Sequence, residues 1–181
     1  MNQNLDFKYI YDIYHLMVFN LSIQYVQNLE DAEEITQDVF IQVYNSINSF
    51  HQKSTIKTWI YRITINKSLD FIKQKNSKKR FFIFGKKVEN DFEINNITNF
   101  ENPENIIENL ENNKLIFYLI NQLPENQKTA FLLSKIEDNT NTEISEIMNI
   151  SISAVESLIF RAKKNLKEKL TIYFDKKHKK L

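Results

Sequence analysis

The sequence predicts an all-α protein of two small helical domains joined by a flexible acidic linker, the C-terminal domain being a helix-turn-helix. Three observations indicate this. The 181 residues include one glycine and two prolines, so turn formers are scarce. Apolar residues recur at helical spacing in both halves. Between the halves lies an acidic, Asn-rich stretch without clean periodicity, typical of a linker. The expected boundaries are 5–80, 81–102 and 103–175.

The composition narrows the class of protein. Cysteine is absent, which excludes disulfides and thiolate metal sites and suits a reducing compartment. The N-terminus lacks the pattern of a signal peptide, and no apolar run approaches the length of a membrane span. We therefore expect a cytoplasmic protein that is not inserted in a membrane.

Charge is strongly segregated although the net charge is only +1. Residues 28–50 hold five acids and no Lys or Arg, whereas residues 51–80 hold nine bases and one acid. Residues 89–113 hold seven acids and no base, and residues from 161 onward hold nine bases and two acids. Blocks of this kind indicate different partners for different faces, with two basic contacts to a polyanion.

The first half predicts three helices. Apolar residues at helical spacing predict the first over 6–27. Asn28 can cap the second, whose first turn holds Glu30 and Asp31. The apolar stripe of the second helix is Ala32, Ile35, Val39, Val43 and Ile47.

After a polar loop at 51–57, a third helix is expected over 58–75. Its stripe of Trp59, Ile63, Asn66 and Asp70 includes two polar residues, which cost free energy on a packing face unless they are paired or meet a ligand. The stretch from residue 76 to 102 is interpreted as linker. Pro103 is expected to restart a helix, and Pro124 marks another helix start.

The stretch 142–169 predicts a helix-turn-helix that ends in a basic helix. Its apolar spacing packs two helices across a tight turn, in which Asn149 suits a left-handed position. Ser153 and Glu156 match a capping box, so the second helix should start near Ala154. The apolar residues are Ile144, Met148, Ile150, Val155 and Leu158. This is the geometry of a major-groove reader, although a helical hairpin with a solvated basic face would look similar.

Three motifs in order resemble the extracytoplasmic-function (ECF) sigma factors, small two-domain factors of bacterial transcription initiation. Residues 31–44 read DAEEITQDVFIQVY, residues 57–74 read KTWIYRITINKSLDFIKQ, and residues 123–166 run from LPENQK to RAKKNL. With the linker they span nearly the whole chain. Asn139 and Asn149 stand where the family has glycines, Ser145 where it has alanine and Lys128 where arginine is common.

The resemblance implies two partners, core RNA polymerase and promoter DNA. The acidic second helix would dock on the clamp coiled coil through Glu34, Gln37, Asp38 and Ile41, and the polymerase flap would be a further contact. Without the resemblance, a solvated acidic face would be the favoured explanation of these residues. The acidic linker would thread channels that later hold nucleic acid. An anti-sigma factor is a further possible partner.

The resemblance also implies two DNA contacts. The loop and third helix would recognise and open the −10 element, with a flipped base near Asn66 and phosphates on the basic side chains. The residues are Lys53, Ser54, Thr55, Ile56, Lys57, Trp59, Arg62, Asn66 and Lys67. Trp59 lies at helical spacing that is more typical of a core residue.

The recognition helix would read the −35 element in the major groove. The residues are Ser153, Ala154, Glu156, Ser157, Phe160, Arg161 and Lys164. Arg161 can contact a base edge or only phosphate. Glu156 can accept from a cytosine amino group, although a capping box would already explain it.

Other classes of protein fit the sequence less well. The three histidines (His15, His51, His178) are far apart, and there is no Gly-rich phosphate loop or nucleophile motif, so neither an enzyme nor a cofactor is expected. A stand-alone helix-turn-helix regulator would need an apolar sensor pocket or a dimer face in the first half. A helical adaptor without DNA contact leaves the two basic blocks unexplained.

Overall fold

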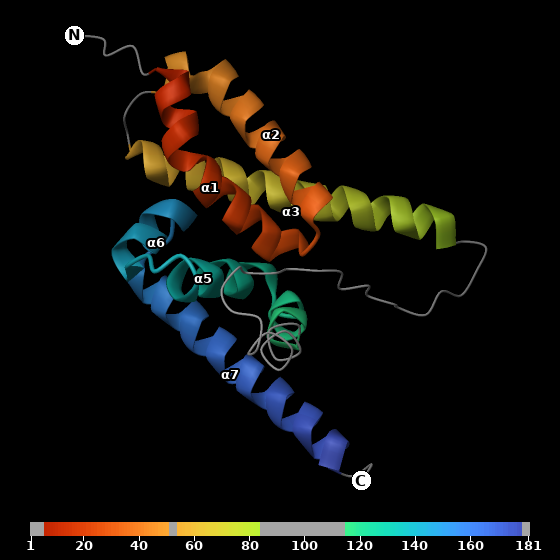
Figure 1. The fold of residues 1–181 in the computed structure, drawn as a ribbon. Coiled ribbons are helices and arrows are strands. Elements are labelled where there is room, and N and C mark those ends of the chain that lie inside the picture. Colours follow the sequence, from red (N-terminus) through yellow and green to blue (C-terminus); the bar gives the residue numbers. More distant parts are fainter. Residues whose placement is uncertain (1–5, 51–53, 84–114, 179–181) are drawn as a thin grey trace, which may run out of the picture. The chain divides into compact units, whose positions relative to one another are not determined.

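The computed structural model describes residues 6–50, 54–83 and 115–178, and these residues form helices and turns without a strand. The chain divides into two compact units, Met1–Ile97 and Thr98–Leu181. Unit 1 contains α1 (Phe7–Val26), α2 (Leu29–Ser46), a short 3-10 helix (Ile47–Ser49) and α3 (Ile56–Ile83). Unit 2 contains a helical segment at 115–121, α5 (Glu125–Lys135), α6 (Asn141–Met148) and α7 (Ile152–His178). Figure 1 shows these elements coloured along the sequence.

Unit 1 is a three-helix bundle in which each helix packs on the other two. Its core consists of Ile10, Val18, Ile35, Val39, Phe40, Val43, Ile60 and Ile63. Three buried hydroxyls in this unit, one in each helix, donate to the carbonyl four residues earlier and so avoid an unpaired donor. They belong to Ser22, Thr36 and Thr64.

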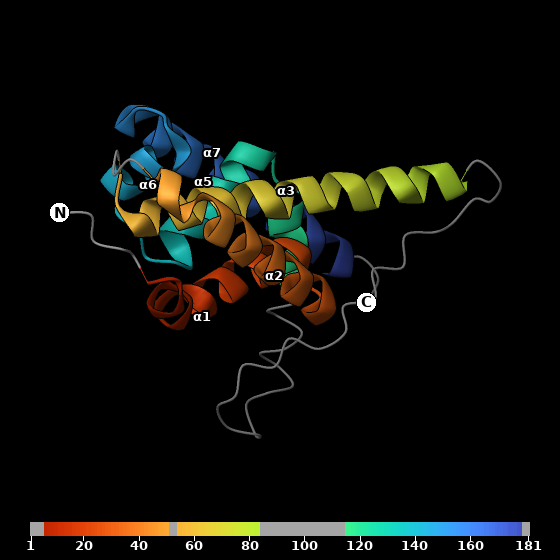
Figure 2. The same ribbon diagram turned by 90° about the horizontal axis from the view of Figure 1, so that it is seen from above.

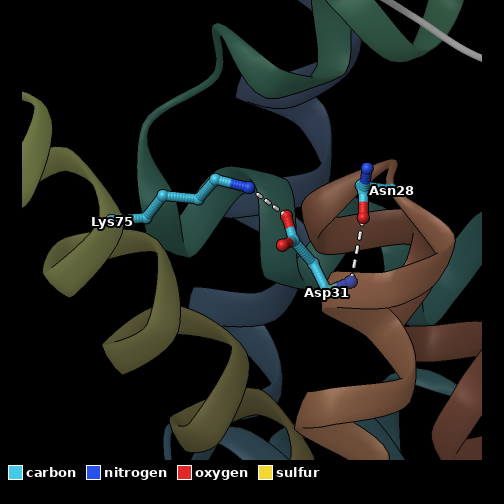
Figure 3. Close-up of polar contacts among 3 residues, drawn as sticks. All are labelled: Asn28, Asp31 and Lys75. Carbon is cyan, nitrogen blue, oxygen red and sulfur yellow. Dashed lines mark hydrogen bonds and ion pairs between the residues drawn. The ribbon is translucent and has the colours of Figure 1, made fainter.

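Local chemistry sets the end of α1 and the start of α2, and the cap of α2 is the predicted one. Gln27 adopts the left-handed conformation at φ 54° and ends α1. Asn28 then caps α2, its side-chain Oδ1 accepting from the N–H of Asp31 at 2.9 Å. Figure 3 shows Lys75 of α3 paired with the Asp31 carboxylate, which joins the start of α2 to α3.

The third helix is longer than its apolar pattern predicts. It begins at Ile56 and runs through residues 76–83, where the sequence suggested a linker. Figure 2 and Figure 1 both show this end of α3 extending past α1 and α2. An apolar stripe reports which face of a helix is buried and not helicity itself, so its end does not mark the end of the helix. The rest of the predicted linker, its acidic block and the helix expected from Pro103 lie outside the described residues.

Unit 2 packs α7 against both α5 and α6. Its buried side chains include Leu132, Leu133, Ile144, Val155 and Ala162. Two side-chain hydrogen bonds tie α7 to the preceding elements: the Asn165 amide donates to Gln127 at 2.8 Å, and the Lys169 ammonium donates to Gln122 at 2.9 Å. Among the described residues, no helix is long and apolar enough to span a bilayer, and no three acidic or histidine side chains are grouped as metal ligands.

Candidate functional site

The outer face of α2 carries the four residues that the resemblance assigns to polymerase docking. Glu34, Gln37 and Asp38 are exposed, and Ile41 is 59% exposed. The opposite face of the helix lies in the core of unit 1. Packing in the core therefore fixes the position of α2. The outer side of α2 presents carboxylates, an amide and an aliphatic side chain together.

Tyr44 extends this face by one turn and was not among the predicted residues. It is 64% exposed, and its ring stands edge-on to Phe7 of α1 at a centroid distance of 5.2 Å. Phe7 also meets Phe40 edge-on, and the ring centroids of Tyr11 and Phe40 are 4.7 Å apart. Tyr44 follows Gln37 and Ile41 at helical spacing, but spacing alone does not tell an exposed aromatic residue from a buried one.

The start of α3 is built by a threonine cap and an aromatic pair. Thr55 Oγ1 accepts from the N–H of Thr58 at 3.1 Å. Trp59 is half-buried against the core, with its ring 4.9 Å from that of Phe50. Lys53 lies outside the described residues, and Ile56 and Lys57 belong to the helix and not to the expected loop. The contacts of Trp59 are those of a packing residue that anchors the preceding segment.

The predicted packing stripe of α3 is wrong for its two polar members. Asn66 and Asp70 are exposed, and the buried face instead contains Ile60, Tyr61, Ile63, Thr64 and Ser68. The reason is that α3 packs on both α1 and α2, so it buries a wide face and leaves Asn66 on the outer side. The amide of Asn66 is thus accessible.

The basic side chains of α3 lie on or near that outer side. Lys57 is exposed, with its ammonium 5.7 Å from the centre of the Tyr61 ring, while Arg62 and Lys67 are half-buried. Lys67 Nζ lies 3.7 Å from the carboxylate of Asp38, and the two side chains are 32% and 57% exposed. An ion pair this exposed contributes at most about 1 kcal/mol. It places the predicted docking face and the predicted DNA-binding face side by side.

The turn between α6 and α7 forms as predicted. Asn149 has φ 55° and ψ 48°, the left-handed conformation. The Ser145 hydroxyl donates to the carbonyl of Ile150 at 2.7 Å, so the serine closes the turn. At the preceding corner the left-handed residue is Asp138, at φ 50°, and not its neighbour Asn139, which is buried.

The capping box predicted for the recognition helix is wrong. Helix α7 begins at Ile152, and the Ser151 Oγ accepts from the N–H of Ala154 at 3.2 Å. The Ser153 hydroxyl lies 3.1 Å from that of Ser151. Both serines can serve as an N-cap, although only Ser153 has a Glu three residues later, and the tight turn at Asn149 makes the earlier serine the cap. The capping box of this motif belongs to α6, between Thr140 and Glu143.

The predicted reading residues share α7, away from its buried side. Ser153, Glu156, Arg161 and Lys164 are exposed, Phe160 is 70% exposed, and Ala154 and Ser157 are half-buried. The inner side consists of Val155, Ile159, Ala162 and Leu166. Of the apolar residues predicted for the motif, Ile144 and Val155 are fully buried, while Met148, Ile150 and Leu158 are only half-buried.

Lys128 of α5 is a buried cation inside unit 2. Desolvation by burial lowers its pKa from 10.5 to about 8. Its ammonium donates to Asn121 Oδ1, which joins α5 to the helical segment at 115–121. No sequence pattern marked this residue as buried.

Family models match both halves of the chain in order. Residues 10–78 match sigma-70 region 2, and residues 114–166 match sigma-70 region 4. The first match covers the bundle of unit 1, and the second covers α5, α6 and the first half of α7. A stand-alone regulator is not favoured, because the first half is itself accounted for by a sigma-factor region.

Curated relatives agree with the family models over most of their length. The chain is 31% identical over 158 residues to the ECF RNA polymerase sigma-E factor of Haemophilus influenzae, covering 87% of this chain and 83% of the relative. It is 30% identical over 171 residues to the ECF RNA polymerase sigma factor SigW of Bacillus subtilis, covering 89% and 87%.

Solved structures share the fold. The sigma factor RpoE of Bartonella quintana, solved in complex with the anti-sigma factor NepR, superposes with a TM-score of 0.68 at 19% identity, covering 92% of this chain and 98% of that one. CnrH, solved with the cytosolic domain of CnrY, gives a TM-score of 0.65 at 17% identity, covering 92% and 88%. The chain belongs to the ECF family of RNA polymerase sigma factors.

Proposed function

We propose that this sigma factor binds core RNA polymerase and directs it to promoters, unit 1 recognising and opening the −10 element and unit 2 recognising the −35 element. The observation that carries the proposal is the order of the two family matches, region 2 over residues 10–78 and region 4 over residues 114–166. The factor would act in the cytoplasm, without a cofactor and without catalysis of its own.

Docking on the clamp coiled coil would use the outer face of α2. Glu34, Gln37, Asp38 and Ile41 would meet a helical partner rich in arginine, because carboxylates bind guanidinium groups through charge-assisted hydrogen bonds. Tyr44 would add apolar contact at the end of this face. The polymerase flap would be contacted separately, by unit 2.

Contact with the −10 element would use α3 and the segment before it. Asn66 would hydrogen-bond the edge of an unpaired base, since its exposed amide has both a donor and an acceptor. The basic side chains Lys53, Lys57, Arg62 and Lys67 would bind phosphates. Ser54, Thr55, Ile56 and Trp59 would shape the pocket, Trp59 through its packing on Phe50.

Contact with the −35 element would use the outer side of α7 in the major groove. Arg161 and Lys164 would bind phosphates at the groove edge, and Phe160 would make apolar contact with a thymine methyl group. Ser153, Ala154, Glu156 and Ser157 lie nearer the start of the helix, which is the part that meets base edges in this motif.

Control of the factor would lie in an anti-sigma partner. RpoE of Bartonella quintana is solved with the anti-sigma factor NepR, and its fold covers 92% of this chain. A partner of that kind would compete with polymerase for the exposed faces of the two units.

The direct test of the proposal is binding to fork-junction DNA with and without core polymerase. Fork-junction DNA should be preferred over plain duplex only when core is present, and affinity should fall steeply with salt because each phosphate contact releases roughly one counterion. Tight binding to plain duplex by the factor alone, with no response to core, would contradict the proposal.

A further inference from the structure

Glu156 has no capping role in the structure. The N-terminus of α7 is capped by Ser151, whose hydroxyl accepts from the N–H of Ala154. Glu156 is exposed, three residues after Ser153. Its Oε1 atom lies 3.5 Å from the amide nitrogen of Asn141, which is a long contact. A contact at this distance leaves the carboxylate with nearly its full capacity to accept hydrogen bonds.

Two elements of the motif converge on this carboxylate. Asn141 is the first residue of α6, held by the Thr140–Glu143 capping box, and Glu156 lies in the second turn of α7. In a helix-turn-helix the second helix enters the major groove with its N-terminal residues on base edges, while the first crosses the backbone. Glu156 is therefore in the part of the helix that meets bases.

The part of the reading surface that precedes Arg161 contains no cation. From Thr140 to Phe160, covering α6, the turn and the first nine residues of α7, the sequence has no Lys or Arg, and the first is Arg161. The commonest specific contact in the major groove, a bidentate arginine on guanine, is thus unavailable in this stretch. The ionisable groups on offer are carboxylates.

A carboxylate selects one base by elimination. Guanine presents two acceptors in the major groove, thymine presents an acceptor and a methyl group, and adenine presents an acceptor beside its donor. Cytosine alone presents a donor, its N4 amino group, without an acceptor. An acceptor-only group such as Glu156 is therefore complementary to cytosine, is repelled by guanine and thymine, and at adenine meets the N7 acceptor beside the N6 donor.

We propose that Glu156 is a specificity-determining residue of this factor, which selects a cytosine in the −35 duplex by accepting a hydrogen bond from its N4 amino group. This inference rests on the proposed function of unit 2. It commits the factor to a C·G pair at one position of the element, read from the cytosine side.

The test is transcription by core polymerase with the full-length factor from a barcoded template library randomised over the −35 region. The wild type should favour cytosine at one position by roughly fivefold to a hundredfold, the usual range for a good base contact. Glu156→Ala should lose that preference at that position and keep the others. Glu168→Ala, which removes another exposed carboxylate of α7, is the matched control and should keep every preference.

A chemical probe then identifies the contact. The selected cytosine is replaced by 2-pyrimidinone, which lacks the N4 amino group. This replacement should lower transcription by the wild-type holoenzyme as much as Glu156→Ala does. It should cause no further loss of transcription in that variant. Unchanged base preferences in Glu156→Ala, with active transcription, would overturn the inference and leave the proposed function intact. Absence of any transcript with the wild-type factor would overturn the proposed function and this inference with it.

Discussion

At the scale of single residues, the buried cation Lys128 affects stability most directly. Its ammonium lies inside unit 2, and burial lowers its pKa to about 8. The unfolded chain, with a pKa near 10.5, therefore binds this proton more tightly than the folded chain does. Below about pH 8 the folded state bears the full free-energy cost of burying the protonated ammonium. This cost decreases as the pH rises from about 8 towards 10.5.

We therefore expect the free energy of unfolding of unit 2 to rise between pH 7 and pH 10, by an amount on the order of 2–3 kcal/mol from this group. Lys128→Met should be more stable than the wild type at pH 7 and should lack this rise. Urea unfolding followed by far-ultraviolet circular dichroism measures both. Lys135→Met, on the exposed end of the same helix, is the control.

The single tryptophan supplies an internal reference for this experiment. Trp59 lies in unit 1, so its fluorescence should report a transition that Lys128→Met leaves unchanged. Identical pH dependence of the wild type and Lys128→Met in unit 2 would contradict the assignment of the buried charge.

Asp38, which pairs with Lys67, is a residue that we expect to matter for binding but not for stability. Their separation of 3.7 Å and their exposure imply a contribution of at most about 1 kcal/mol to folding. A charge-assisted hydrogen bond to a partner is worth about 1.5–3 kcal/mol.

We expect Asp38→Asn to weaken binding to core polymerase by roughly tenfold or more while changing the free energy of unfolding by less than about 1 kcal/mol. Binding is measured by fluorescence anisotropy of labelled factor titrated with core. Asp12→Asn, an exposed carboxylate of α1, should bind core as the wild type does. Equal binding by the wild type, Asp38→Asn and Asp12→Asn would count against α2 as the docking helix.

At the scale of elements, the sequence predicts a cap or a left-handed turn residue where one residue alone suits the position. It does not decide between two neighbouring residues that suit the position equally. Asn28 and Asn149 were assigned correctly, because each acts through its own backbone position. The cap of α7 was misassigned because Ser151 and Ser153 both lie at the helix start and both can cap it, and only the turn geometry decides between them. The outer position of Asn66 could not be read from spacing, since it depends on α3 packing against two helices at once.

The corrected cap makes its own prediction. Ser151→Ala should cost about 1 kcal/mol of unit 2 stability, the usual value for losing a serine N-cap, whereas Ser153→Ala should cost clearly less. Urea unfolding of the two variants, compared by circular dichroism, measures the difference. The reverse order of stabilities would restore Ser153 as the cap.

At the scale of the whole molecule, the segregation of charge and the order of the motifs indicated the function more strongly than any single site did. The acidic block contributes the outer face of α2, and the first basic block contributes the outer side of α3. Tyr44 was missed because nothing in the sequence distinguishes an exposed aromatic residue from a buried one at the same spacing, and its exposure follows from how α1 and α2 pack. Lys128 was missed for the same reason.

As a sigma factor, this chain gives core RNA polymerase its promoter specificity. Run-off transcription with core polymerase of the source bacterium, with and without the purified factor, on a pool of genomic promoters tests it most directly. We expect discrete transcripts only when the factor is present, from promoters that share two elements. No factor-dependent transcript, together with no co-elution of the factor with core, would contradict it.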